Sequence, residues 1–362
     1  MGEEVGKVNE EAWVTLATNE TYAIGALVLA HSLKKVGTQR KLAILVTKSL
    51  ESKTMRKALE ETFDVVQDVE EMDSFDAVNL KLLQRPELGI TFTKLHCWCL
   101  TQFSKCVFLD ADTFVMKFCD ELFDRKELSA APDAGWPDCF NSGVFVFKPS
   151  VETFESLVAF AQKEGSFDGG DQGLLNSYFD TWATQDIETH LPFVYNMCAT
   201  ATYTYLPAYK KFGESVKIVH FIGMSKPWDA QRDSQSGRPI SRAQDSHAGD
   251  HLEKWWSIYE AHVKPILQHD VSLIGSFSSQ HPSLVHENNP SAISASQNAR
   301  LVCPPKDNRL SWEKGCPDYM GTASFDKILE RINTTLLEEE PESKKEEEPE
   351  SKKEEEQRED ES

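Results

Sequence analysis

The regular alternation of short apolar runs with amphipathic segments constrains the fold of this chain most strongly. Runs typical of buried strands are expected at residues 13–18, 42–47, 64–69, 106–109, 143–147 and 217–220. Segments with the apolar spacing of helices are expected at residues 22–36, 53–62, 94–103, 151–162, 171–179 and 250–267. This βαβα order predicts an α/β fold, with a mainly parallel sheet covered by helices on both faces.

The sequence changes character after residue 268. Residues 269–309 are rich in Ser, Asn, Gln and Pro, which is typical of a flexible linker. Residues 310–337 again carry apolar side chains, with helical spacing near their end, and predict a short helical segment. Residues 338–362 contain the octapeptide EEEPESKK twice and predict a disordered acidic tail. One folded domain is therefore expected at residues 10–268.

Charge and composition exclude several classes of protein. The net charge of −21 argues against a protein that binds the phosphate backbone of nucleic acids. No apolar run approaches the length that spans a bilayer, and the first seven residues lack the apolar stretch of a signal peptide. The eight cysteines form no paired C-x-x-C spacing of a zinc site. Reduced thiols without a targeting segment predict a cytoplasmic protein.

The strongest local signal is an apolar run that ends in two carboxylates, Asp110 and Asp112. In extended chain, residues two apart point the same way, so both carboxylates would face one point outside the strand end, where α/β sheets bind ligands. Such a pair suits a divalent cation that bridges to phosphate oxygens. A solvated turn is the alternative without function. A calcium loop fails at Phe114 and Val115, whereas a phosphatase with an aspartyl nucleophile remains a second hypothesis, disfavoured by Phe114.

A second signal follows the expected strand at residues 217–220. His220 is followed by Gly223 and Lys226, and a glycine that permits close backbone approach plus a lysine is a plausible clamp for a diphosphate. A lone histidine after a strand is more often a packed or surface residue. If His220 joins Asp110 and Asp112, the mixed nitrogen and oxygen ligands favour Mn²⁺ over Mg²⁺.

A third signal is the glycine-rich stretch at residues 165–176, where Asp168, Asp171 and Gln172 precede or open a helix. These side chains could bind sugar hydroxyl groups on a backbone that comes close to the ligand. The alternative is a plain loop in which Asp171 caps the helix.

Taken together, four motifs resemble the glycogenins, retaining glucosyltransferases of glycosyltransferase family 8 with the GT-A nucleotide-sugar-binding fold. The motifs are FLDAD (residues 108–112), WPDCFNSGVF (136–145), FDGGDQG (167–173), and HFIG with KPW (220–228). The resemblance runs from about residue 13 to residue 267. It resumes at residues 312–321, which resemble the segment through which that family recruits glycogen synthase.

The resemblance implies a role for individual residues. Asp110, Asp112 and His220 would bind Mn²⁺. Lys94 and Asp171 would act in catalysis, and Tyr203 would accept the first glucose, although Tyr205 lies only two residues away. The residues that would bind UDP-glucose are Leu16, Thr18, Asn19, Tyr22, Arg85, Lys94, Asp110, Ala111, Asp112, Asn141, Ser142, Asp168, Asp171, Gln172, His220, Gly223 and Lys226.

The function implied is self-glucosylation: transfer of glucose from UDP-glucose to the enzyme's own tyrosine, then extension as a short α-1,4-glucan that primes glycogen synthesis. The resemblance also implies a homodimer, and recruitment of glycogen synthase through residues 312–337. A second hypothesis is a catalytically weak scaffold that recruits glycogen synthase.

Overall fold

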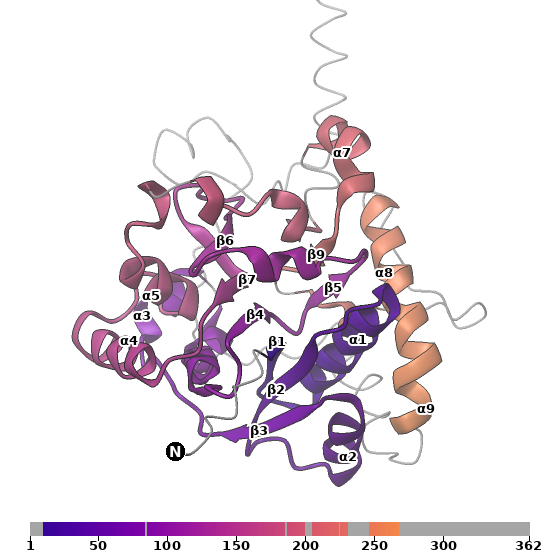
Figure 1. Cartoon of the computed structure of the whole chain (residues 1–362), viewed down its shortest axis with the longest axis horizontal. Helices are drawn as coiled ribbons and strands as arrows, with labels where there is room; N and C mark the ends of the chain where they lie inside the picture. Colours follow the sequence, from indigo (N-terminus) through magenta and orange to yellow (C-terminus); the bar gives the residue numbers. More distant parts are fainter. Residues whose placement is uncertain are drawn as a thin grey trace, which may run out of the picture. The chain divides into compact units, whose positions relative to one another are not determined.

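The computed structural model describes residues 10–83, 85–184, 187–199, 205–223, 225–230 and 246–267. All of them belong to one compact unit, residues 1–284 (Figure 1). The expected linker, the expected partner-binding segment and the acidic tail lie outside the described residues, and so does Tyr203.

A six-stranded sheet forms the centre of this unit, in the order β3-β2-β1-β4-β7-β6. The strands are β1 (Glu11–Ala17), β2 (Lys41–Thr47), β3 (Val65–Val69), β4 (Lys105–Leu109), β6 (Ser129–Pro132) and β7 (Phe140–Phe147). Neighbours from β3 to β4 pair in parallel, whereas β7 pairs antiparallel with β4 and with β6. The expectation of a mainly parallel sheet is confirmed.

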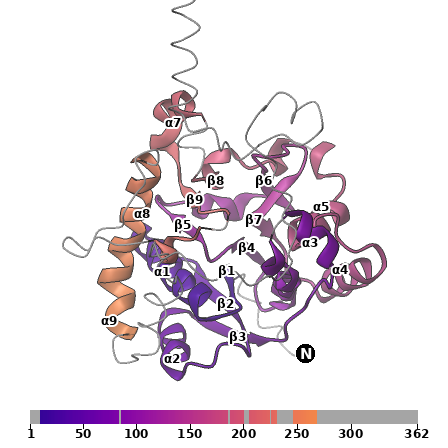
Figure 2. The same ribbon diagram turned by 180° about the vertical axis from the view of Figure 1, so that it is seen from behind.

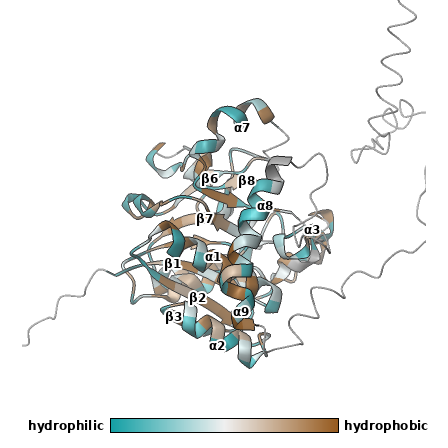
Figure 3. Ribbon diagram, turned by 90° about the vertical axis from the view of Figure 1, so that its right-hand side faces the viewer, coloured by the Kyte–Doolittle hydropathy of each residue, from teal (hydrophilic) through white to brown (hydrophobic). Residues whose placement is uncertain are grey.

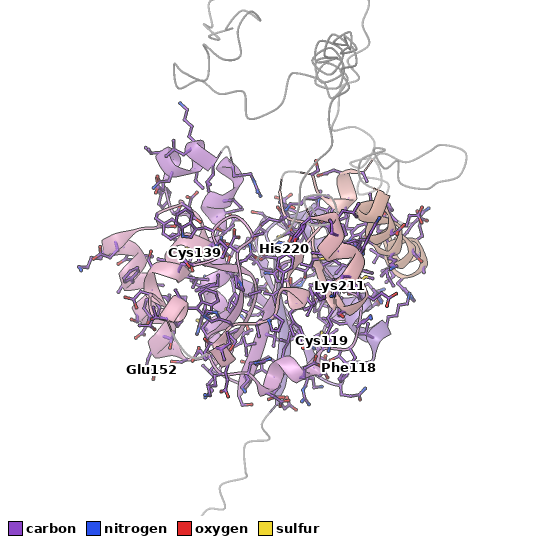
Figure 4. The ribbon with its side chains drawn as sticks, turned by 90° about the horizontal axis from the view of Figure 1, so that it is seen from above. Phe118, Cys119, Cys139, Glu152, Lys211 and His220 are labelled. Carbon is purple, nitrogen blue, oxygen red and sulfur yellow. The ribbon has the colours of Figure 1, made fainter. Side chains whose placement is uncertain are left out.

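Helices cover both faces of this sheet (Figures 1 and 2). One core contains buried side chains of α1 (Glu20–Val36), α2 (Lys53–Thr62), α8 (Ser246–Ile258) and α9 (Lys264–Leu267). The other contains side chains of α4 (Val151–Glu164) and α5 (Asp171–Tyr178). Along β1, Trp13 lies in the first core and Val14 in the second, which is the alternation that a strand buried on both faces requires. In Figure 3, the hydrophobic strands β2 and β7 lie in the interior of this unit.

Local sequence explains where the helices begin and end. Asn19 caps α1, because its Oδ1 accepts hydrogen bonds from the backbone nitrogens of Thr21 and Tyr22, both at 3.1 Å. Gly37 ends α1 with a left-handed φ of 88°, a conformation that glycine adopts without strain. Serines cap α2 and α4 in the same way as Asn19 caps α1.

Several features differ from the expectations, among them the strand β6, which was not expected. The helix expected at residues 94–103 is a 3₁₀ helix, η2 (Phe92–Cys99), and α3 (Ala77–Leu83) was not expected. The strand expected at 217–220 is β9 (Ile218–His220), which joins a second sheet with β5 (Thr113–Val115) and β8 (Met197–Cys198), in the order β5-β9-β8. Short strands carry too few residues for their pattern to show which sheet they join.

The remaining helical elements connect these layers. A π-helical turn, η9 (Tyr259–Val263), joins α8 to α9 within the helix expected at residues 250–267. The others are α7 (Leu206–Phe212), η1 (Pro86–Ile90), η3 (Asp120–Asp124), η4 (Trp182–Thr184), η5 (Ile187–Thr189), η6 (Phe193–Tyr195), η7 (Gly213–Ser215) and η8 (Pro227–Asp229). Among the described residues, no helix is both long enough and apolar enough to cross a bilayer.

Candidate active site

The two carboxylates lie where the central sheet meets the small sheet. Asp110 follows β4, and the backbone nitrogen of Thr113 donates to Asp110 O at 2.9 Å, so the chain makes a tight turn between Asp110 and β5. The expectation that Asp110 and Asp112 converge because the chain is extended is therefore wrong. They converge through this turn, and the antiparallel register of β5 with β9 places His220 opposite Thr113.

Asp110, Asp112 and His220 form one candidate metal site. A ligand atom from each residue lies within 4.8 Å of the others. His220 Nε2 lies 3.3 Å from Asp112 Oδ1 and 3.9 Å from Asp110 Oδ2. His220 and Asp112 are buried, whereas the Asp110 side chain is 30% exposed and can reach a bound ligand. Two carboxylate oxygens and one imidazole nitrogen fit a first-row divalent metal ion.

Charged neighbours perturb the two carboxylates in opposite directions. Burial raises the pKa of Asp112, but His220 and Lys226 outweigh burial and hold the pKa well below its usual range. Burial also raises the pKa of Asp110, and the negative charges of Asp112 and Asp171 raise it further, against the opposing effect of Lys94. The pKa of Asp112 is thus lower than that of Asp110.

Lys94 lies in η2 and joins the metal site to Asp171. Its side chain is only 3% exposed, and its Nζ lies 2.9 Å from Asp110 Oδ1 and 2.5 Å from Asp171 Oδ2. Nζ also donates to Ser142 O at 3.2 Å. Burial lowers the pKa of Lys94, but the two carboxylates outweigh burial and raise it above its ordinary value. The ammonium group is therefore held charged between two acids.

Asp171 opens α5, but its side chain does not cap that helix. Gly170 is the N-cap residue and makes no side-chain bond to the helix, while Asp171 Oδ2 accepts from Lys94 Nζ and, at 2.8 Å, from Ser142 Oγ. The carboxylate therefore faces the candidate site, as sugar binding would require. The alternative of a plain helix cap does not describe this residue.

Asp168 and Gln172 occupy different positions around this acid. Asp168 Oδ1 accepts from Ser166 Oγ at 2.8 Å and from the backbone nitrogens of Gly170 and Gly173 at 2.9 and 3.0 Å, so this oxygen shapes the loop. Burial raises the pKa of Asp168. Gln172 Oε1 accepts from the backbone nitrogen of Ser142 at 3.2 Å, which ties α5 to β7 beside the candidate site.

Asp133 is a residue of this site that the sequence analysis missed. Its Oδ2 accepts from Asn141 Nδ2 at 2.9 Å and from Gln172 Nε2 at 3.2 Å, so it holds two of the expected sugar-binding residues. Burial raises the pKa of Asp133, but these bonds and the one from the Gly135 backbone outweigh burial and lower it. Its position, just after a strand and two residues before a glycine, is the signal that could have revealed it.

Gly143 is a second residue that was missed, and here the signal is steric. A Cβ atom added at Gly143 would lie less than 3.0 Å from the His220 ring, closer than real Cβ atoms approach their neighbours. Gly25 in α1 is similar, because a Cβ there would lie less than 3.0 Å from Trp228 and from Ala111 O. Glycine at these two positions allows the elements of the site to approach one another.

The residues expected to bind uridine and the diphosphate come from several elements. Leu16, Thr18 and Asn19 lie at the carboxyl end of β1 and its junction with α1, and the ring of Tyr22 packs edge-on against Trp228 at 5.2 Å. Gly223 has a positive φ of 106°, and Lys226 Nζ pairs with Asp112 and donates to Phe221 O at 3.3 Å. Arg85 follows α3, and its backbone N–H donates to Leu80 O at 3.0 Å.

Comparison with known proteins gives a consistent family. The model of glycosyl transferase family 8 matches residues 13–127 and 124–232. Glycogenin-1 of Oryctolagus cuniculus is 50% identical over 335 residues, which cover 91% of this chain and 100% of that protein. Glycogenin-1 of Caenorhabditis elegans is 54% identical over 253 residues, covering 70% of this chain and 56% of that protein.

Similar solved structures are also glycosyltransferases. The apo form of GlyE from Streptococcus pneumoniae TIGR4 has a TM-score of 0.48 at 19% identity, covering 72% of this chain and 62% of that one. An active-site mutant of LgtC has a TM-score of 0.46 at 16% identity, covering 67% and 94%.

The family match and the relatives confirm the expected fold class and the expected enzyme class, a glucosyltransferase. The scaffold hypothesis is not favoured, because the match with three glycogenins covers 91% of this chain and the whole length of each of them. The phosphatase hypothesis finds no support in the family match. The chain belongs to glycosyltransferase family 8 and, within that family, to the glycogenins.

Proposed function

We propose that this enzyme transfers glucose from UDP-glucose to Tyr203 of its own chain and then extends it as a short α-1,4-glucan that primes glycogen synthesis. The observation that carries the proposal is the convergence of Asp110, Asp112 and His220 beside Lys226. A diphosphate needs positive charge, and this acidic protein supplies that charge locally through a cation site and a lysine.

The three ligand residues would hold Mn²⁺, which when bound supplies positive charge that stabilises the leaving UDP. Lys226 pairs with the same carboxylate, Asp112, and so lies within reach of a diphosphate bound at that centre. Gly223 has a left-handed backbone and no side chain. Phosphate oxygens could therefore come close to the backbone of this loop. Leu16, Thr18, Asn19, Tyr22 and Arg85 would hold the uridine.

The glucose would lie against the residues that join α5 to β7. The carboxylate of Asp171 would stabilise the positive charge that develops at the anomeric carbon as the bond to UDP breaks. Lys94 and Ser142 fix the position of that carboxylate. The remaining sugar contacts would come from Ala111, Asn141, Asp168 and Gln172.

The acceptor in the first transfer would be the phenol oxygen of Tyr203. A phenol has a reference pKa of about 10 and must lose its proton as it attacks. A phosphate oxygen of the leaving group or a nearby carboxylate would take that proton, and later transfers would use a hydroxyl group of the growing glucan. As in the family it resembles, the enzyme would retain the configuration at the anomeric carbon, act as a cytoplasmic homodimer and present the tyrosine of one subunit to the site of another.

The function is tested by incubating the purified protein with radiolabelled UDP-glucose and Mn²⁺. We expect label on the protein, none after treatment with EDTA, and better recovery with Mn²⁺ than with Mg²⁺. Absence of label under all metal conditions would contradict self-glucosylation.

Tyr203→Phe is expected to abolish attachment of the first glucose, because only the acceptor oxygen is lost. Transfer to an added maltoside should stay close to the wild-type rate, since the change leaves the donor site intact. The measurement compares label on protein with label on maltoside. Tyr205→Phe is the matched control and should still be labelled; peptide mapping that places glucose on Tyr205 of the wild type would contradict the choice of Tyr203.

Deletion of residues 310–362 is expected to leave self-glucosylation intact and to abolish capture of glycogen synthase. This segment would dock as a helix, because Phe325, Ile328, Leu329 and Ile332 follow helical spacing. A pull-down comparing the full chain with this deletion, and with a deletion of residues 338–362 alone, measures the effect. Loss of capture in the shorter deletion would assign binding to the acidic tail instead.

A further inference from the structure

Asn196 is a buried polar residue that bonds directly to a candidate metal ligand. It follows η6, precedes β8 and is 2% exposed. Its Oδ1 lies 3.0 Å from His220 Nδ1, and its Nδ2 donates to Asn141 Oδ1 at 2.8 Å. Neither the sequence motifs nor the assigned site residues include Asn196. Its side chain connects the ring of His220 to the residues around Asp133.

Asn141, at the end of this hydrogen-bond network away from His220, determines which atoms donate and which accept. Asn141 Oδ1 accepts from the backbone nitrogen of Gly143 at 3.0 Å, and a backbone N–H can only donate. The other end of the Asn141 amide, Nδ2, donates to Asp133 Oδ2 at 2.9 Å, and an ionised carboxylate can only accept. Asn141 therefore presents its oxygen to Asn196, and the NH₂ group of Asn196 must donate to it.

That orientation determines which nitrogen of His220 carries the proton. With its NH₂ group turned to Asn141, Asn196 presents oxygen to His220 Nδ1, so Nδ1 must donate and carry the hydrogen. In the neutral ring Nε2 is then left with its lone pair. Nε2 is the nitrogen that lies 3.3 Å from Asp112 Oδ1 and 3.9 Å from Asp110 Oδ2.

We propose that Asn196 is a positioning residue for the metal site, which holds His220 in the Nδ1–H tautomer so that the Nε2 lone pair faces the cation between Asp110 and Asp112. The proposal rests on the proposed metal site, and it assigns the origin of that site's geometry to a residue that contacts neither metal nor substrate. Residues that orient metal-bound histidines in this way typically change metal affinity by about 10- to 100-fold when they are replaced.

The first test measures the tautomer in the full-length protein with saturating Mg²⁺, which is diamagnetic, because without a cation the Asp112 carboxylate itself favours a hydrogen on Nε2. Histidine-selective ¹⁵N labelling and two-bond ¹⁵N–¹H spectra distinguish the two neutral tautomers, and comparison with His220→Asn identifies the His220 signals. We expect the hydrogen on Nδ1 in the wild type. A hydrogen on Nε2 in the wild type would overturn the proposal without any substitution at Asn196.

The second test measures the dissociation constant for Mn²⁺ from the electron paramagnetic resonance of free Mn²⁺, with no nucleotide sugar present. Asn196→Leu should move the hydrogen of His220 to Nε2 and weaken Mn²⁺ binding by about 10- to 100-fold. Asn196→Asp keeps an oxygen that accepts from Nδ1, but its second oxygen faces Asn141 Oδ1 instead of donating to it. It should therefore lower the melting temperature, keep the hydrogen of His220 on Nδ1 and bind Mn²⁺ more tightly than Asn196→Leu does. Wild-type affinity in a folded Asn196→Leu protein, or equal loss in both variants, would overturn the proposal.

Asn176→Leu is the matched control, because Asn176 also bonds to β7, through the backbone nitrogen and oxygen of Phe140, but not to His220. This control should lower the melting temperature without changing the tautomer of His220 or the affinity for Mn²⁺. If it lost as much Mn²⁺ affinity as Asn196→Leu, loss of stability alone would explain the weaker binding, and the specific role of Asn196 would be overturned. Asp112→Asn in the same titration separates the two proposals. Loss of binding there but not in Asn196→Leu refutes only the positioning role, whereas retained binding there refutes the metal site itself.

Discussion

Asp110→Asn and Asp112→Asn are each expected to lower glucose transfer by about a thousandfold or more, which corresponds to about 4 kcal/mol of lost transition-state stabilisation. Each change keeps the size of the side chain but removes a negative charge at the candidate metal site. The effect should be largest for Asp112, because Asp112 is buried and also faces Lys226, so its replacement leaves that ammonium group without its carboxylate.

The measurement is the initial rate of label transfer from UDP-glucose at saturating Mn²⁺, with circular dichroism as the check that the fold persists. Asp124→Asn is the matched control, because Asp124 is an exposed acid at the end of η3. It should transfer glucose at the wild-type rate. Undiminished Mn²⁺-dependent transfer in Asp112→Asn would remove the metal-site hypothesis.

Lys94→Met is expected to reduce both activity and stability. The substitution leaves Asp110 and Asp171 facing each other without the cation that lies 2.9 and 2.5 Å from them. Removing one partner from a buried ion pair typically costs about 3–5 kcal/mol, because the charge that remains is buried without compensation. Transfer should fall by about a hundredfold or more even well below the melting temperature, since Asp171 loses a group that positions it.

Denaturant unfolding and the rate of label transfer measure these two effects separately. Lys126→Met removes a lysine that lies 2.8 Å from Glu188, but both of those side chains are more than half exposed. Exposed ion pairs contribute about 0–1 kcal/mol, so this control should change neither quantity appreciably. If Lys94→Met were as stable and as active as Lys126→Met, the central role of Lys94 would be refuted.

Much of the fold could be predicted because local patterns carry it. The helix expected at residues 53–62 is α2 with the same bounds, and α1 ends at Val36, the expected last residue of its helix. Apolar runs at β1, β2 and β4 predicted buried strands, since strands covered on both faces must be apolar throughout. The 3₁₀ helix η2 was expected as an α-helix, because apolar spacing over eight residues does not separate the two.

Residue patterns pointed to the candidate site where its residues cluster in sequence, whereas isolated residues such as Lys94 were named only through the family resemblance. Asp110 and Asp112 stand together after an apolar run, and Asp168, Asp171 and Gln172 stand together among glycines. The roles of Asp133 and Gly143 were missed, because contacts reveal them: the Asp133 carboxylate accepts from two side-chain amides, and the Gly143 backbone lies against the His220 ring.

The amino-acid sequence by itself determined that this chain forms an α/β domain with acids at a strand end, because hydrophobic periodicity and helix capping act between residues a few positions apart. Only the tertiary structure decided that Lys94 lies between Asp110 and Asp171, and that Asn196 faces His220. Asp171 is 77 positions from Lys94, and His220 is 24 positions from Asn196. Such pairs meet because whole strands and helices pack in one register, and a single local pattern contains no information about that register.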